Sequence, residues 1–381
     1  GNSMSIRQMF PGSIVKPGFN PLAAQTPIYT YNLYSWGASS NGQLGLGNTT
    51  TYSSPKQVGA LSNWSKLATG LFQAVAVKAD GTLWSWGDNS SGQLGLGNTT
   101  NYSSPKQVGA LTAWSQIAVG FSHAIATKTD GTLWSWGSGS SGKLGLGNAT
   151  SYSSPKQVGA LTTWLKVAAN LYQSFAIKTD GTLWSWGEGA AGKLGLGNTT
   201  TYSSPKQVGA LTNWSVVASG RFFTCAVKTD GTFWAWGANN FGQLGIGNTT
   251  YYSSPKQVGA LTNWLNTSAG QYHCVSVKTD GTLWSWGYNN SGQLGVNNLT
   301  NYSSPKQVGA LTNWATPSCG FYFAFCIKTD GTLWSWGANS AGSPTLGLNN
   351  TTQYSSPKQV GSLTTWSNVS GGYEQAFAIA Y

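Results

Sequence analysis

The chain repeats itself with a period of 50 residues. A Trp-Gly pair recurs seven times at this interval, at Trp36, Trp86, Trp136, Trp186, Trp236, Trp286 and Trp336. The motif Y-S-S-P-K-Q-V-G follows each pair, and its seventh copy begins two residues late, at Tyr354, because Ser343 and Pro344 are inserted. A unit of this length cannot bury its apolar faces alone, so seven copies predict a closed array.

The pattern within each repeat is that of short strands. In one copy, apolar runs at residues 74–78 and 83–86 flank Asp80-Gly81, a pair that predicts a two-residue type I′ hairpin turn. Pro and Lys in residues 104–108 indicate an exposed edge strand, and residues 114–119 supply a fourth strand. Four antiparallel strands repeated seven times predict an all-β fold, a single seven-bladed β-propeller that needs no helix.

The two ends of the sequence predict how the ring closes. Counted in register, residues 374–381 should pair with residues 32–36 and complete one blade from both termini. We therefore assign residues 30–381 to the propeller. Residues 4–29 form a Pro-rich, partly basic N-terminal arm, interpreted as a linker or an attachment peptide, and residues 1–3 precede Met4 as a cloning remnant.

These motifs resemble the regulator-of-chromosome-condensation repeat. The resemblance rests on W-S-W-G, then N-x-x-G-Q-L-G-L-G, S-P-x-x-V and A-x-G-x-x-H-A-x-A-x-K-x-D-G-T, and it covers residues 32–381. It implies a seven-bladed propeller closed by both termini. Its known members include a nucleotide exchange factor for a small GTPase, a plant UV-B photoreceptor and a bacterial β-lactamase inhibitor, so the resemblance leaves the function open.

Two of these activities are not favoured by the sequence. The resemblance implies that exchange activity uses a wedge and loop system that projects from the propeller. Such a system should appear as insertions, and Ser343-Pro344 is the only internal insertion. The resemblance implies that the photoreceptor forms a dimer through a G-W-R-H-T segment on one face. The matching segment of this sequence, residues 120–124, reads G-F-S-H-A. All 20 tryptophans occupy repeated columns, so we interpret them as core rings between blades. We expect neither exchange activity nor light sensing.

The sequence offers no catalytic, metal or cofactor motif. Six of its nine acidic residues are turn aspartates, which leaves Asp88, Glu188 and Glu374 on different blades. Two histidines three units apart are too few for a metal site. The four cysteines (Cys225, Cys274, Cys319 and Cys326) are interpreted as small buried thiols, with a Cys319–Cys326 disulfide left open. We expect no enzyme activity and no cofactor.

The net charge of +11 is spread along the sequence. One lysine per repeat lies in the edge strand, where it blocks strand pairing. Because these lysines form no single basic patch, we expect no specific nucleic-acid binding. No stretch has the length and apolarity of a membrane span, and the N-terminus has no apolar signal segment. We expect a monomer that is cytoplasmic or virion-associated.

The repeats differ most in the three residues that follow A-x-G. Each such triplet joins two strands, so all seven should emerge on one face around the central channel, and each contains an aromatic residue. Variable aromatic loops on a fixed scaffold indicate a binding surface. The candidate partner-binding residues are Phe72, Phe121, His123, Tyr172, Arg221, Phe222, Phe223, Tyr272, His273, Phe321, Tyr322, Phe323 and Tyr373. The loops after W-G, with Asn240-Phe241 and Tyr288-Asn289, are expected to be solvated.

The sequence therefore favours a non-catalytic scaffold that presents aromatic loops to a protein or glycan. Residues 221–223, 271–273 and 321–323 form the densest aromatic sector. The alternative interpretation of these rings is that they plug the channel or cap the core. The alternative function is a structural component of a virion or cell surface, because near-identical units with polar loops are typical of viral or bacterial sequences.

Overall fold

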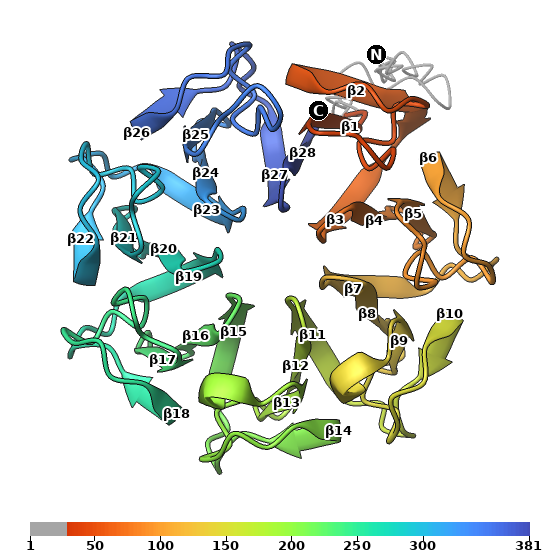
Figure 1. Cartoon of the computed structure of the whole chain (residues 1–381), viewed down its shortest axis with the longest axis horizontal. Helices are drawn as coiled ribbons and strands as arrows, with labels where there is room; N and C mark the ends of the chain where they lie inside the picture. The colour runs from red at the N-terminus through yellow and green to blue at the C-terminus, as the bar shows by residue number, and fades with distance from the viewer. Residues whose placement is uncertain (1–28) are drawn as a thin grey trace, which may run out of the picture. The chain divides into compact units, whose positions relative to one another are not determined.

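The computed structural model describes residues 29–381, of which Tyr31–Tyr381 form the propeller. Its strands make seven four-stranded antiparallel sheets arranged as blades in a ring (Figure 1). Residues of all seven innermost strands line a central channel. The predicted fold class is confirmed. The predicted N-terminal arm, except for Tyr29, lies outside the described residues.

In each blade the first two strands lie nearest the channel. The innermost strands are β3 (Trp64–Thr69), β7 (Trp114–Val119), β11 (Trp164–Ala169), β15 (Trp214–Ser219), β19 (Trp264–Ala269), β23 (Trp314–Cys319) and β27 (Trp366–Gly371). The second strands are β4 (Gln73–Lys78), β8 (His123–Lys128), β12 (Gln173–Lys178), β16 (Phe223–Lys228), β20 (His273–Lys278), β24 (Phe323–Lys328) and β28 (Gln375–Ala380).

The third and outermost strands contain the W-x-W-G and S-P-K-Q motifs. The third strands are β1 (Asn32–Gly37), β5 (Leu83–Gly87), β9 (Leu133–Gly137), β13 (Leu183–Gly187), β17 (Phe233–Gly237), β21 (Leu283–Gly287) and β25 (Leu333–Gly337). The outermost strands are β2 (Tyr52–Ser62), β6 (Tyr102–Gln107), β10 (Tyr152–Gln157), β14 (Tyr202–Gln207), β18 (Tyr252–Gln257), β22 (Tyr302–Gln307) and β26 (Tyr354–Gln359). Two single 3-10 turns, η1 (Ser140–Gly142) and η2 (Ala190–Gly192), were not expected.

The ring closes through a blade shared by the two ends of the propeller. Its strand order is β2-β1-β28-β27, so the C-terminal strand β28 pairs with β27 on one side and with β1 on the other. The β1–β28 register runs from Asn32 opposite Ala380 to Gly37 opposite Gln375. This arrangement confirms the closure predicted from the sequence and leaves neither β1 nor β28 as an open edge.

The Asp-Gly turns differ from the prediction. The Lys78 N–H donates to the Thr82 carbonyl (3.0 Å) and the Gly81 N–H to the Lys78 carbonyl (2.9 Å). Gly81 has a φ of +79°, whereas Asp80 is not among the residues with positive φ. The hairpin is therefore a three-residue loop, a type I turn followed by a left-handed glycine, and not a type I′ turn. Asp80 Oδ1 is instead fixed by the Thr82 N–H (2.9 Å) and hydroxyl (2.6 Å).

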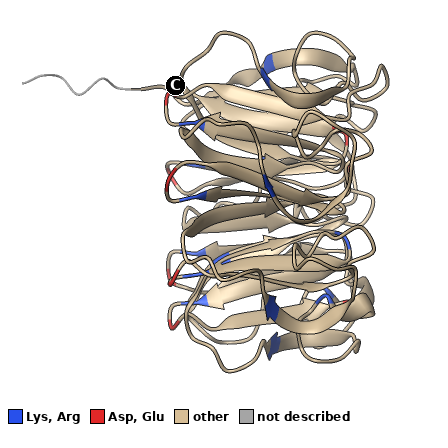
Figure 2. Ribbon diagram, turned by 90° about the vertical axis from the view of Figure 1, so that its left-hand side faces the viewer, with Lys and Arg blue, Asp and Glu red and all other residues tan. Residues whose placement is uncertain are grey.

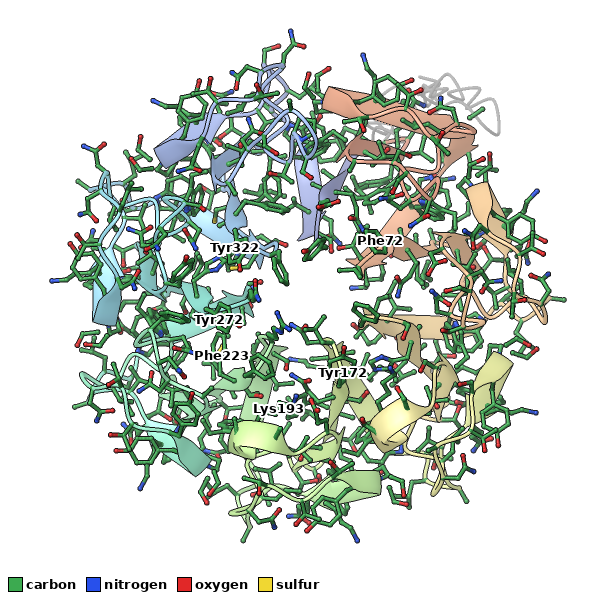
Figure 3. All side chains as sticks on the ribbon, viewed as in Figure 1. Phe72, Tyr172, Lys193, Phe223, Tyr272 and Tyr322 are labelled. Carbon is green, nitrogen blue, oxygen red and sulfur yellow. The ribbon has the colours of Figure 1, made fainter. Side chains whose placement is uncertain are left out.

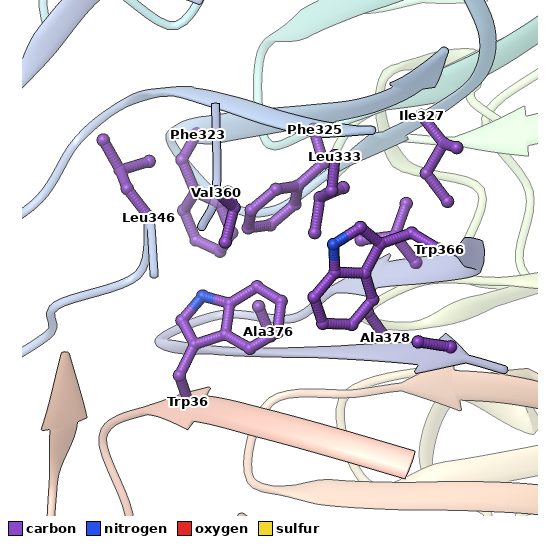
Figure 4. Packing of buried hydrophobic residues seen from close by; sticks show 12 residues of the cluster. Trp36, Phe323, Phe325, Ile327, Leu333, Leu346, Val360, Trp366, Ala376 and Ala378 are labelled. Atoms are coloured by element: carbon purple, nitrogen blue, oxygen red, sulfur yellow. The ribbon is translucent and has the colours of Figure 1, made fainter. Parts of the chain in front are cut away.

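The second tryptophan of each W-x-W motif links neighbouring blades. Its ring is fully buried, and its Nε1–H donates to a backbone carbonyl of the preceding blade. Trp86 donates to Gln43 (3.0 Å), and Trp36 closes the series by donating to Thr345 (2.8 Å). Figure 4 shows Trp36 packed against Phe325 of the preceding blade. These contacts agree with the interpretation of the tryptophans as core rings.

Candidate binding face

The seven triplets lie at the end of the blades opposite the Asp-Gly turns. They join the innermost strand of each blade to its second strand, while the turns join the second strand to the third, and antiparallel strands place these loops at opposite ends. We call the end with the triplets the triplet face and the other end the turn face. In Figure 2, most of the acidic residues lie on the side of the C-terminus, which is the turn face.

The three positions of a triplet have different surroundings. The first residue lines the mouth of the central channel, in the order Leu71, Phe121, Leu171, Arg221, Gln271, Phe321 and Tyr373. The second residue, for example Phe72, Tyr172, Tyr272 or Tyr322 (Figure 3), is not among the residues that line the channel. The third residue is the first residue of the second strand, and its side chain is buried in every blade.

This burial corrects four of the candidate residues. His123, Phe223 and His273 have no exposed side-chain surface, and Phe323 has 1%. The structure does not present these four side chains at the surface, because the third position packs between blades. His123 Nε2, for example, lies 2.9 Å from the Ser174 hydroxyl of the next blade. Burial also lowers the pKa of both histidines, to about 3 for His273, so neither ring is charged at neutral pH.

Eight half-buried aromatic rings form a continuous arc on the triplet face. Successive ring centroids are 4.1–6.2 Å apart, and all but Phe321–Tyr373 (4.1 Å) lie within the usual range of aromatic pairs. In order along the arc, the rings are Phe222, Tyr272, Phe241, Tyr288, Tyr322, Phe321, Tyr373 and Phe72. The structure therefore brings together six of the predicted residues. A smaller pair, Phe121 and Tyr172, lies on two other blades (5.9 Å).

Sequence reasoning missed two members of the aromatic arc. Phe241 and Tyr288 belong to loops after W-G, which we expected to be solvated, yet their ring centroids lie 4.8 Å apart and both rings pack against Tyr272. Asn289, in the same class of loop, is also not solvated, because its side chain is fully buried. An available signal was that W-G loops and triplets lie at the same end of a blade. The Tyr288 N–H donates to the Tyr272 carbonyl (2.9 Å).

Three cations continue from the end of the arc. Lys193 Nζ lies 5.2 Å from the Phe222 ring centroid and 5.8 Å from that of Tyr172. Lys143 Nζ lies 5.3 Å from the Tyr172 centroid, and the Arg221 guanidinium lies 4.9 Å from that of Phe222. Cations and rings thus alternate along this sector, which we call the cationic sector.

The two lysines of the cationic sector replace glutamines of other blades. In four blades that glutamine accepts a hydrogen bond from a backbone N–H two residues earlier, as Gln243 Oε1 does from Phe241 (2.9 Å). Lysine cannot accept, and the two lysine-containing loops are the ones that form η1 and η2. Their residues Ser141 and Ala191 take positive φ, a conformation that costs free energy for a residue with a Cβ.

Both lysines are buried, but their polar partners differ. Lys143 is 1% exposed, and its ammonium donates to the hydroxyls of Ser122 (3.3 Å) and Ser140 (3.1 Å) but to no carboxylate among residues 29–381. Burial lowers the pKa of Lys143 to about 8. Lys193 pairs with Glu188, which makes the single ion pair within residues 29–381. Burial also lowers the pKa of Lys193, the Glu188 carboxylate opposes this shift, and the nearby Arg221 adds to it.

The cysteines give no site. All four are free and buried, and the sulfur atoms of Cys225 and Cys274, from neighbouring blades, lie 3.5 Å apart without a bond. Burial raises the pKa of Cys326 to about 12, so its thiol is inert at neutral pH. In the part of the protein that the structure describes, no three His, Cys, Asp or Glu residues are close enough to hold a metal. Nor does any helix among the described residues have the length and apolarity to cross a membrane.

Comparisons with solved structures find the same fold. Prp20p from Saccharomyces cerevisiae, whose structure is described together with its binding to Gsp1p and histones, superposes with a TM-score of 0.82 at 19% identity, covering 93% of this protein and 92% of that one. Human WBSCR16 gives a TM-score of 0.82 at 21% identity, covering 92% and 99%. At these identities the likeness concerns the fold. No curated protein sequence matches significantly.

A family model gives the assignment. The Regulator of chromosome condensation (RCC1) repeat matches seven consecutive segments, residues 32–77, 80–127, 130–177, 180–227, 230–277, 280–327 and 330–379. These seven segments equal the blades in number and cover most of the sequence. The protein belongs to the RCC1 repeat family.

Proposed function

We propose that this propeller is a non-catalytic scaffold that binds a protein partner through its triplet face. The observation that supports this most strongly is the aromatic arc, because eight half-buried rings from adjacent loops form one surface. Half-buried Tyr and Phe side chains offer large contact areas while they lose little conformational entropy on binding. Arg221 at the end of the arc adds the residue type most often found with them in binding hot spots.

The distribution of variation supports the same face. The S-P-K-Q motif is unchanged in all seven repeats, whereas every triplet is different. A residue needed only to close the blade should be as uniform as that motif. Prp20p, which shares the fold, is described as binding the proteins Gsp1p and histones.

The acidic residues support a role without catalysis. The six turn aspartates are each engaged by a threonine and lie at the turn face. On the triplet face Glu188 is paired with Lys193. Among the described residues of that face, Asp88, Glu188 and Glu374 belong to different blades, which does not favour general acid–base chemistry by a carboxylate pair.

The test compares two triple variants of the intact protein. Peptides selected from a random phage-displayed library against the wild-type propeller serve as probes. In Phe222→Ala/Tyr272→Ala/Tyr322→Ala we expect their affinity to fall at least about 100-fold, since single aromatic anchors contribute roughly 2 kcal/mol or more. The melting temperature should change little, because these rings are only half-buried.

The matched control removes exposed apolar residues elsewhere. Leu211→Ala/Leu261→Ala/Leu311→Ala changes side chains that are 45–50% exposed and lie in the loops that lead to the innermost strands from the turn face. This variant should bind the probes as the wild type does. If the leucine variant loses binding and the aromatic variant keeps it, the triplet face is not the binding surface. If the aromatic variant unfolds, its rings are core plugs, which was the alternative interpretation.

A further inference from the structure

Two adjacent first positions at the mouth of the central channel carry strongly polar side chains. The seven first-position side chains include Leu71, Phe121 and Phe321, and the two strongly polar ones are Arg221 and Gln271. These two belong to neighbouring blades, and the Arg221 N–H donates to the Gln271 carbonyl (3.3 Å). Adjacent polar side chains beside large apolar ones such as Phe121 and Phe321 are the kind of arrangement that fixes the orientation of a ligand.

Both polar side chains have unused hydrogen-bonding groups. Arg221 Nε is buried without a partner, and within residues 29–381 no carboxylate pairs with its guanidinium. Gln271 is only 4% exposed, and its Oε1 also has no partner among the described residues. A buried polar atom without a hydrogen bond costs roughly 1–3 kcal/mol, so such atoms in a native protein need an explanation. A ligand that supplies an acceptor to Arg221 and a donor to Gln271 would satisfy both.

The positive charge around the mouth favours an anionic ligand. Lys193 and Arg221 both lie near the Phe222 ring, and Lys143 lies near the Tyr172 ring. Of these three cations only Lys193 has a carboxylate partner within the described residues. The guanidinium rests on the Phe222 ring (4.9 Å), which excludes water from one side and leaves its other donors for an anion. An arginine held in this way can present two parallel N–H groups, the geometry that a carboxylate accepts.

We infer that the channel mouth binds a carboxylate of the protein partner, with Arg221 donating to its oxygens and Gln271 accepting a neighbouring N–H. This inference rests on the proposed function and names the group that the partner inserts beside the aromatic arc. The side-chain carboxylate of Asp or Glu and the terminal carboxylate of a peptide share this chemistry, since each has an amide N–H nearby.

The experiment uses three short peptides that differ in one group. Ac-Phe-Glu-Phe-NH2 carries a side-chain carboxylate, Ac-Phe-Gln-Phe-OH a terminal one, and Ac-Phe-Gln-Phe-NH2 none. Arg7 and Arg221 are the only arginines of the sequence, so the Arg Nε–H region of an NMR spectrum reports on Arg221 with little overlap. We expect a carboxylate peptide to shift the Arg221 signal and to bind at least about tenfold more tightly than the neutral peptide. The more potent of the two carboxylate peptides identifies the source.

Two variants complete the test. In Arg221→Gln the preference for carboxylate peptides should disappear, whereas Arg221→Lys, which keeps the charge but not the paired donors, should retain part of it. Equal affinity for all three peptides, or an Arg221 signal that stays unmoved up to millimolar peptide, overturns the inference.

The same data separate this inference from the proposed function. Peptides that bind without regard to the carboxylate, and lose affinity in the Phe222/Tyr272/Tyr322 variant, leave the triplet face as a binding surface and remove the carboxylate site. A carboxylate-dependent shift that is unaffected by the aromatic variant supports the channel site and counts against the aromatic arc.

Discussion

The two ends of the propeller differ in how uniform their blades are. On the turn face the same hydrogen bonds recur in six blades, where an Asp accepts from a Thr hydroxyl at 2.6–2.7 Å and that hydroxyl accepts from a Trp Nε1–H at 2.8–2.9 Å. On the triplet face the blades differ, with glutamine, histidine and phenylalanine sharing one buried position. The repeated residues therefore hold the blades together, whereas the varied residues are not fixed by that role.

The turn face also contains several of the protein's lysines, and their ammonium groups lie over tryptophan rings. Lys228 lies with its ammonium 3.7 Å from the Trp234 ring centroid and 4.8 Å from that of Trp214. Four further turn lysines repeat this arrangement. These cations lie over the protein's own rings. Like Arg221 and Lys143, they form no ion pair with a carboxylate within residues 29–381.

The largest stability effect should come from breaking the turn face. In Thr182→Val/Thr232→Val/Thr282→Val, each substitution removes the hydroxyl that joins an aspartate to a tryptophan. We expect a loss of about 1 kcal/mol per blade, about 3 kcal/mol in total, because valine keeps the shape and leaves a Trp Nε1–H without its acceptor. Urea unfolding followed by tryptophan fluorescence measures it.

The matching change on the triplet face is Phe222→Ala/Tyr272→Ala/Tyr322→Ala. If that variant loses as much stability as the threonine variant, the two faces do not differ in role and the comparison fails.

A smaller effect, of opposite sign, should come from Lys143. Lys143→Gln restores the residue of other blades, whose Oε1 accepts from the loop backbone, and removes a buried cation. The pKa of Lys143 falls from 10.5 in the unfolded protein to about 8 in the fold. Charge burial therefore destabilises the fold below pH 8, and this cost disappears as the pH rises toward 10.5. We expect a gain of about 1–2 kcal/mol at pH 7.

The pH dependence provides the check on this prediction. The gain of Lys143→Gln should shrink between pH 8 and pH 10, measured as the difference in urea midpoint from the wild type. Lys106→Gln, at an exposed edge-strand position, should change the midpoint little at either pH. A variant that is less stable than the wild type at pH 7 would show that the ammonium contributes more through Tyr172 and the serine hydroxyls than its burial costs.

The sequence predicted the blades better than the face. The period of 50, the Trp columns and the offset of residues 374–381 were sufficient for strand order and closure, because these features follow from burial and pairing alone. The turn type was missed because Asp-Gly also suits a type I turn with a following left-handed glycine, and only the pairing of Lys78 with Thr82 distinguishes the two.

The prediction of the triplet face was incomplete, for a different reason. Which loops vary is visible in the sequence, but which side chain of a loop turns inward depends on where the next strand begins. Phe222 and Phe223 are neighbours of one residue type, yet Phe223 starts β16 and is buried. The inclusion of Phe241 and Tyr288 depends on contacts between loops that are distant in the sequence.

Mapping where independent ligands bind tests most directly whether the triplet face is the binding surface. Unrelated peptides selected from a random library against the whole propeller would each be footprinted by amide hydrogen exchange, with the triplets and the Asp-Gly turns read in one experiment. If the triplet face is the binding surface, most of the peptides protect residues 221–223, 271–273 and 321–323 and leave residues 79–82 and their repeats unchanged. Protection that falls mainly on the turn face, or spreads evenly over both ends, would contradict it.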